Sequence, residues 1–377
     1  MVRFRNDLFC LGQRMLRGVG QAVRVALLLL LLTACAFPGT VRPTVKMGLV
    51  APFEGRYRYV GYDVIYAVQL ALHEVNENGG VAGYGVELVA YDDGASPSAA
   101  VEQARKLDVD PAVVGAIGHF REETTAAVSH AYTEAGVPLL VAAVLSPGAT
   151  GDHQTVYYLG PGARPLAEAL LERALRLAPG GELALIGQSG PLGAALQEAA
   201  RERTGKELPT VSTAARGWEM EVLERQPSVI VLDLQPVRAG EVVSTLREEG
   251  WSGRVLGGPA LAPSDFVAVA GPSAAGTVFV TPWPFPADVP DGEAFVTAYR
   301  GVSGGVEPGP LALPAYEATW TLLGALEQAG ADGELTRNGV NAALSNTRRR
   351  GTLLDGGGER RDVELYWYRI GPDGMPE

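Results

Sequence analysis

The chain alternates between two kinds of apolar pattern over most of its length. Short continuous apolar stretches predict buried strands, and stretches whose apolar residues recur every three or four positions predict helices. A first series contains predicted strands at 45–52, 86–93, 112–118 and 137–143, separated by predicted helices at 62–80, 98–107 and 124–136. Continuous apolar strands that alternate with helices favour a parallel sheet covered on both faces.

The same alternation begins again after residue 155. This second series has predicted strands at 155–160, 182–187, 227–234, 254–258 and 276–282, with predicted helices at 165–177, 191–205, 238–250 and 264–271. Residues 283–346 are mostly helical in pattern, and a last strand is expected at 361–370. The predicted fold class is therefore α/β, with two doubly wound parallel-sheet lobes. A ligand can bind between the strand ends of two such lobes, and a hinge can close over it.

The N-terminal segment predicts export. An apolar run at 25–32 follows a basic flank and is too short to cross a bilayer, which takes roughly 20 residues. It fits the apolar centre of a secretory signal. The sequence "LTAC", ending at Cys35, resembles a bacterial lipobox, which implies that Cys35 is lipidated and becomes the first mature residue. The alternative is an uncleaved anchor with an incidental cysteine.

We therefore expect a lipoprotein signal peptide at 1–34 and a Pro- and Gly-containing tether at 35–43. Met15 begins a better-proportioned signal and is the expected start of translation. The rest of the chain then works outside the cytoplasm, anchored to the membrane by lipid alone.

Composition limits the possible functions. The 377 residues are 47% apolar and 20% charged, which is normal for a soluble globular protein of two domains. The net charge is −12, and without residues 1–34 it is −16, so nucleic-acid binding through bulk charge is excluded. The two cysteines, Cys10 and Cys35, both precede the predicted lobes, which therefore have no disulfide.

Several stretches together resemble one known family. "VKMGLVAPFEGRYRYVGYDVIYAVQLALHEVNENGGVAGYGVELVAYDD", "VVGAIGHF", "AGVPLLVAA", "TPWPFP" and "PAYEATWTLLGALEQAG" occur in the order and spacing of type I periplasmic binding proteins of the branched-chain amino acid and amide class. The resemblance covers about Val45 to Tyr368 and is strongest up to Pro147. It implies a ligand in the cleft between the lobes, and an ABC-type permease as the docking partner of the closed form.

The resemblance also implies that the chain crosses between the lobes three times, near Tyr157, Thr281 and Leu353. Lobe one is then expected to comprise residues 44–157 plus 282–352. Lobe two is expected to comprise residues 158–281 plus 353–377.

In relatives that bind amino acids, the helix after "GH" holds the ligand carboxylate through hydroxyl groups and backbone N–H groups. The hydroxyl position is Glu122 here, and a carboxylate there repels another carboxylate. The acid that pairs with the ligand ammonium falls near Ala260, and the covering aromatics fall near Leu192 and Gln235. The candidate ligand-binding residues are Glu54, Arg56, Tyr57, Phe120, Arg121, Glu122, Val144, Ser146, Leu192, Gln235 and Ala260.

Two interpretations of the charges at 121–123 stay open. In the first, Glu54 and Glu122 accept a cationic or polyol ligand, while Arg56 or Arg121 binds an acidic part. In the second, Glu122 and Glu123 only stabilise the start of their helix, by roughly 0.3–1 kcal/mol each. Both interpretations predict weak or no binding of leucine.

The sequence offers little support for an enzyme. Ser189 follows a predicted strand, but Pro191 stands where a G-x-S-x-G motif needs its second glycine. The histidines lack metal-ligand spacing, so no metal or cofactor is expected. The sequence predicts a substrate-binding lipoprotein of an ABC importer, for a small polar solute of the amino-acid or amide class. The rivals are a sensing or scaffold lipoprotein on the same fold, and an α/β hydrolase that uses Ser189.

Overall fold

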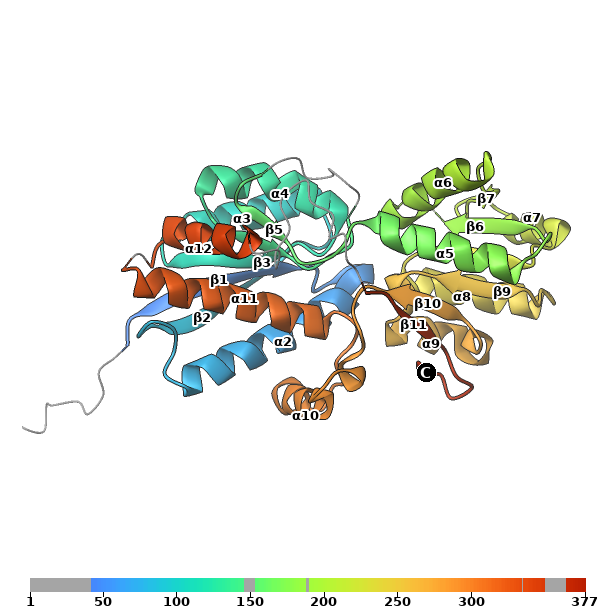
Figure 1. Cartoon of the computed structure of the whole chain (residues 1–377). Helices are drawn as coiled ribbons and strands as arrows, with labels where there is room; N and C mark the ends of the chain where they lie inside the picture. Colours follow the sequence, from blue (N-terminus) through green and yellow to red (C-terminus); the bar gives the residue numbers. More distant parts are fainter. Residues whose placement is uncertain (1–41, 146–152, 188–189, 334, 350–363) are drawn as a thin grey trace, which may run out of the picture. The chain divides into compact units, whose positions relative to one another are not determined.

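The computed structural model describes residues 42–145, 153–187, 190–333, 335–349 and 364–377 (Figure 1). The predictions for Cys35, Ser146, Ser189 and Leu353 fall outside these ranges. Residues 44–377 form one compact unit. Within the described ranges, no helix combines the length and apolar character that a membrane crossing needs.

The first sheet contains five parallel strands in the order β2-β1-β3-β4-β5. They are β1 (Thr44–Ala51), β2 (Gly85–Asp92), β3 (Val113–Gly118), β4 (Leu139–Val141) and β5 (Val156–Tyr158). Every residue of β3 and β4 is buried, because helices cover both faces of the sheet. The predicted parallel sheet is thus confirmed.

Alternate residues of each strand pack on opposite helical layers. In β1, Met47 and Leu49 contact the layer of α2 (Arg58–Glu77), α11 (Ala312–Ala331) and α12 (Arg337–Arg349). Val50 lies in the other core, with α3 (Pro97–Asp108) and α4 (Glu122–Ala135). Figure 1 shows α11 and α12, from the last quarter of the chain, beside the strands of its first half.

The second sheet has the order β11-β10-β9-β8-β6-β7. Its strands are β6 (Leu183–Gly187), β7 (Thr210–Val211), β8 (Val229–Asp233), β9 (Arg254–Gly257), β10 (Val278–Thr281) and β11 (Tyr366–Arg369). Strands β6 to β10 pair in parallel, and β11 pairs antiparallel with β10 at the edge. An antiparallel edge strand is common on an otherwise parallel sheet.

Helices cover both faces of this sheet as well. On one side lie α5 (Ala163–Leu177) and α6 (Pro191–Thr204), and on the other lie α7 (Trp218–Arg225), α8 (Pro236–Glu248) and α9 (Ser264–Ala270). The chain returns from β10 through the short helix η4 (Pro286–Asp288) to α10 (Gly292–Ser303), which packs on α2. The predicted α/β class with two doubly wound sheets is confirmed, whereas the exact lobe boundaries stay a prediction.

Local signals position several helix ends as the sequence suggests. Ser96 caps α3 by accepting a hydrogen bond from the Ala99 N–H, and Pro97 occupies the first turn. Gly136 ends α4 in the left-handed conformation, with φ of 64°. These ends fix where the loops that follow the strands begin and end.

Candidate ligand-binding site

The candidate site lies at the carboxyl ends of the central strands in both sheets. In the first sheet, β1 has β2 on one side and β3 on the other, so the loops after β1 and β3 diverge there. In the second sheet, β6 has β7 on one side and β8 on the other, so the loops after β6 and β8 diverge in the same way. Such topological switch points are where open α/β sheets bind ligands. The loops after these four strands supply side chains of the site, together with segments after β4, β9 and β10 and before α11.

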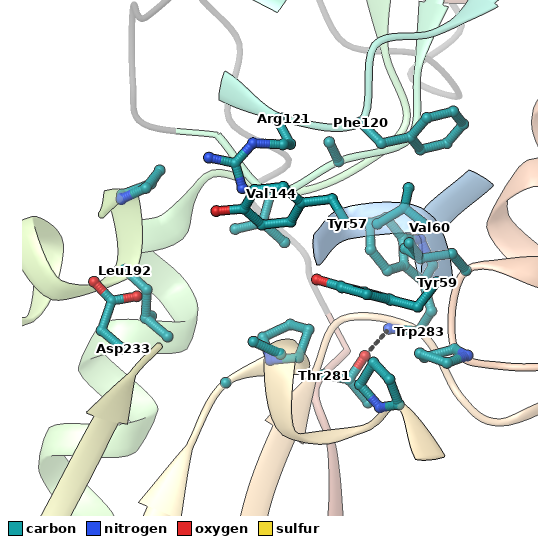
Figure 2. Close-up of a pocket in the computed structure, with 18 of the residues that line it drawn as sticks. Tyr57, Tyr59, Val60, Phe120, Arg121, Val144, Leu192, Asp233, Thr281 and Trp283 are labelled. Atoms are coloured by element: carbon teal, nitrogen blue, oxygen red, sulfur yellow. Dashed lines mark hydrogen bonds between the residues drawn. The ribbon is translucent and has the colours of Figure 1, made fainter. Parts of the chain in front are cut away.

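Two adjoining cavities lie between these segments, and Figure 2 shows the first of them. The first, which we call the apolar cavity, has a volume of about 210 Å³. The second, which we call the charged cavity, has a volume of about 530 Å³. Together they form what we call the cleft, because they share lining residues from both sheets: Tyr57, Tyr59, Phe120, Arg121, Val144, Pro191, Asp233 and Ala260.

Arg121 is a cation of the cleft that is held by an aromatic ring and by a carboxylate. It is the N-cap residue of α4, and its guanidinium carbon lies 3.8 Å from the centre of the Tyr57 ring. This is a close cation–π contact. Its Nη2 donates to both carboxylate oxygens of Glu123, at 2.9 and 3.0 Å. Its Nε is buried and has no hydrogen-bond partner within the described part of the chain.

Aromatic side chains form much of the apolar cavity. In Figure 2 the hydroxyl ends of Tyr57 and Tyr59 point toward the side that carries Leu192 and Asp233. Burial raises the pKa of the Tyr59 hydroxyl, so this group remains a neutral donor. Trp283 lies just after β10, is buried, and donates its backbone N–H to the Thr281 hydroxyl at 3.3 Å.

Asp233 ends β8 and occupies the start of α6. Its Oδ2 accepts hydrogen bonds from the backbone N–H groups of Gly190 and Gly193, both at 3.0 Å. Burial raises the pKa of this carboxyl, and the two hydrogen bonds oppose the rise. A Cβ at Gly193 would lie 2.4 Å from the same Oδ2, so this close contact requires glycine. The chain's own carboxylate thus occupies an anion-binding helix start.

Glu122 and Glu123 form the first turn of α4. Both line the charged cavity, and Glu123 pairs with Arg121. Acidic residues at a helix start are stabilising, so the geometry is compatible with both open interpretations.

His119 connects the elements that position Phe120 and Arg121. This buried residue follows β3, and its Nδ1 lies 2.9 Å from Oδ2 of buried Asp93, which follows β2. Its Nε2 lies 3.3 Å from the Tyr132 hydroxyl on α4. The described part of the chain contains no cluster of His, Cys, Asp and Glu that could hold a metal ion. His119 thus ties two strand ends to α4 immediately before Phe120 and Arg121.

The structure brings most of the predicted residues together. The apolar cavity is lined by Tyr57, Phe120, Arg121, Val144, Leu192 and Ala260. Arg56, Glu122 and Gln235 line the charged cavity alone, and Glu54 lines neither. Sequence reasoning missed the lining residues Tyr59, Asp233, Thr213 and Arg238, whereas Trp283 lies beside the crossing predicted near Thr281. Whether these residues bind a ligand stays a prediction.

Comparison with known proteins decides the family. The family described as "Periplasmic binding protein" matches residues 44–216 and 221–362. The chain belongs to this family. The resemblance to type I periplasmic binding proteins is thereby confirmed, and membership places the protein outside the cytoplasm.

Known members of similar sequence and structure agree with this assignment. A "Leu/Ile/Val-binding protein homolog 2" of Brucella abortus is 26% identical over 318 residues, which cover 79% of this periplasmic binding protein and 82% of the relative. A branched-chain amino acid transporter substrate-binding protein of Streptococcus pneumoniae, solved with isoleucine, has a TM-score of 0.75 at 19% identity, covering 89% of this chain and 98% of that one. A solute-binding protein of R. palustris, solved with benzoate, has a TM-score of 0.73 at 17% identity, covering 89% and 95%. At these identities the structures show the shared fold alone.

Proposed function

We propose that this periplasmic binding protein is the substrate-binding lipoprotein of an ABC-type importer and carries a small organic solute in the cleft. One observation carries the proposal: the switch points of both sheets contribute side chains to the same cavities. A solute that contacts the loops of both sheets stabilises the arrangement in which both reach it. The importer's permease then distinguishes the loaded from the empty protein.

The expected hinge segments are those that connect the two sheets. The chain passes from β5 to α5 between Tyr158 and Ala163, and from β10 to η4 between Thr281 and Pro286. A Cβ at Gly160 would lie 2.3 Å from the carbonyl oxygen of Ala143 and 3.1 Å from the Trp283 ring. The first crossing therefore runs directly beside a lining residue from the second, which couples the hinge to the cleft.

The ligand class remains part of the proposal. The amino-acid or amide class follows from the family resemblance and from the names of the relatives. Leucine itself is expected to bind weakly, because Glu122 and Ala260 replace the groups that would hold its carboxylate and ammonium.

A sensing or scaffold lipoprotein is the second candidate. It is favoured by Asp233, which already uses the two backbone donors at the start of α6. A cleft whose donors are satisfied internally has less to offer a ligand.

Thermal unfolding of the purified protein separates the two candidates. The panel contains amino acids, amides, carboxylates, polyamines, sugars and nucleosides. A ligand at 100 times its Kd adds about 2.7 kcal/mol to stability, which gives a clear rise in the midpoint. We expect such a rise for at least one small solute and none for 1 mM leucine. If no compound raises the midpoint, the importer proposal fails and the scaffold candidate is favoured.

A further inference from the structure

We propose that the cleft selects a small apolar monoanion, a carboxylate on an aromatic or branched aliphatic body without an ammonium group, and that Arg121 binds the carboxylate. This inference rests on the proposed function, a small organic solute carried in the cleft, and assigns that solute to the carboxylates in place of the amino-acid or amide class. Four observations support it. Arg121 has an unpaired buried Nε, and its guanidinium already lies against the Tyr57 ring. Asp233 is hydrogen-bonded to the backbone of the protein itself, and the cavity is lined mainly by apolar side chains.

The unsatisfied side-chain group in the apolar cavity is a donor, whereas Gln235 Oε1, a buried acceptor without a partner among the described residues, lines the charged cavity alone. The buried Nε of Arg121 has no partner among the described residues, and a buried unpaired donor is unfavourable. Its Nη2 is held by Glu123, whose side chain is 55% exposed, and an ion pair with such an exposed partner contributes little. A ligand carboxylate can therefore bond to Nε and compete for Nη2, as guanidinium and carboxylate groups do in two-point contacts.

Among the described residues that line the apolar cavity, a cationic ligand has no equivalent partner. The Tyr57 ring, which could receive a cation, already carries the Arg121 guanidinium at 3.8 Å. Arg56 lies 5.6 Å from the same ring. A ligand cation placed there would meet like charge.

Asp233, the acidic residue of the apolar cavity, already has hydrogen-bond partners within the protein. Asp233 accepts two backbone hydrogen bonds through Oδ2, so the protein itself already uses this oxygen. Burial raises the pKa of the carboxyl, which disfavours its negative charge. Position 260 carries only a methyl group. Within the apolar cavity an amino acid would therefore leave its ammonium without a dedicated partner, because Glu122 and Glu123 line the charged cavity alone. Removing that ammonium from water unpaired is costly.

The remaining wall selects an apolar body. The apolar cavity is lined by Val60, Val144, Leu192, Leu232, Pro259, Pro263, Pro310, Leu311 and Trp283 as well as by Tyr59 and Phe120. Such walls bind apolar groups by excluding water, whereas a sugar would lose hydrogen bonds to water that these side chains cannot replace. The volume of about 210 Å³ lies below the ~300–1,000 Å³ of drug-sized sites and suits a single ring or a branched chain.

Titration calorimetry with matched probes tests this inference. The carboxylates are isovalerate, benzoate and phenylacetate, each compared with its neutral amide. Phenylethylamine and phenylalanine add the cation and the zwitterion. We expect at least one carboxylate to bind about tenfold or more tightly than its amide, since a hydrogen bond to a charged group is worth more than one to a neutral group. Phenylethylamine and phenylalanine should bind more weakly than phenylacetate.

Two variants assign the effect to Arg121. Arg121→Gln should weaken carboxylate binding about tenfold or more and leave the affinity of the amide nearly unchanged, which a general loss of fold would not do. Arg225→Gln is the matched control. Arg225 likewise pairs with glutamates on the surface, but it lies on α7 and lines neither cavity, so it should leave the carboxylate affinity within twofold.

The outcomes separate the inference from the function on which it rests. Equal or tighter binding of phenylethylamine or phenylalanine overturns the inference. So does carboxylate binding that survives Arg121→Gln, or binding of some other solute class when no carboxylate binds. In each case the importer proposal stands, because a solute is still bound. If nothing in either panel binds, both proposals fail.

Discussion

At the scale of single residues, one buried carboxylate connects the segments that form a wall of the cleft. Asp63 on α2 is buried, and its two oxygens accept hydrogen bonds from the N–H groups of Gly309 and Leu311, at 2.7 and 2.6 Å. Leu311 precedes α11 and lines the apolar cavity. Burial raises the pKa of Asp63 from 3.8 to about 7, against the opposing effect of its backbone donors. One carboxylate therefore connects α2, the start of α11 and a cleft wall.

Asp63 should make stability depend on pH. Because its pKa is raised on folding, the folded protein retains this proton between about pH 4 and 7 whereas the unfolded chain loses it. Its contribution to the free energy of unfolding is therefore highest below pH 4 and falls as pH rises through 7, by up to about 4 kcal/mol. Urea unfolding of the natural protein and of Asp63→Asn from pH 4 to 8 measures this as a difference.

The difference between the two proteins removes the effects of all other titrating groups. We expect the natural protein to lose stability relative to Asp63→Asn as the pH increases. A difference that is flat, or that increases with pH, contradicts the assignment.

The same scale shows how far the site could be predicted. Tyr57 and Arg121 could be placed because each follows closely on a predicted strand. Asp233 is the penultimate residue of the strand predicted at 227–234 and was open to the same argument. It was missed because positions in the second half were taken from the register of the family resemblance, which pointed to Gln235. Tyr59 lies in the first turn of α2, and only three-dimensional packing shows that it faces the cavity.

At the scale of elements, α12 is fixed to the first sheet largely by its first residue. The Arg337 guanidinium donates to acceptors at the ends of α3 and α4 and at the start of β3: Leu107, Asp108, Asp110, Val113 and Ala135. A cation suits these helix C-termini, whose carbonyl groups lack partners within the helix. One side chain thus joins segments more than 200 residues apart in the sequence.

Arg337→Lys should be costly although it keeps the charge. Lysine has three donors on one nitrogen and cannot reproduce the planar fork, so part-buried carbonyl groups lose their partners. We expect a loss of about 2–4 kcal/mol in the free energy of unfolding. Chemical denaturation measures it. Arg300→Lys, at a guanidinium that pairs with exposed Glu307, is the control and should change stability by about 0.5 kcal/mol or less. Equal effects of the two substitutions would show that the Arg337 contacts contribute nothing.

Elements were predictable in proportion to the length of their apolar pattern. Strands β3 and β8 are continuous buried runs and were found. Helix α7 has only two buried residues, Trp218 and Val222, one turn apart, and β7 has two residues in all. Patterns this short do not differ from loops, because a period needs several repeats to be seen.

At the scale of the whole molecule, the predicted lipid anchor would decide where the protein works. The predicted lipid on Cys35 would hold the protein at a membrane surface, because acyl chains bury many methylene groups in the bilayer. The Cys35 prediction rests on the sequence alone, since residues 1–41 lie outside the described ranges.

Cys35→Ser should therefore change the partitioning of the expressed protein. We expect the natural protein in the detergent phase of a Triton X-114 extraction and the variant in the aqueous phase or as unprocessed precursor. Cys10→Ser is the matched control, because Cys10 lies far before the lipobox, and it should behave as the natural protein does. A natural protein found in the aqueous phase, or identical behaviour of both variants, would contradict lipidation at Cys35.

The order of the elements along the chain has a consequence for synthesis. The first sheet is complete at Tyr158, but α11 and α12, which cover one of its faces, follow only after Ala312. At about 5–20 residues per second, a ribosome needs on the order of ten to thirty seconds to make the intervening segment. Throughout that interval one face of the nascent sheet is covered by α2 but lacks α11 and α12. The helical layer formed by α2, α11 and α12 is therefore complete only after Arg349 has been added to the growing chain.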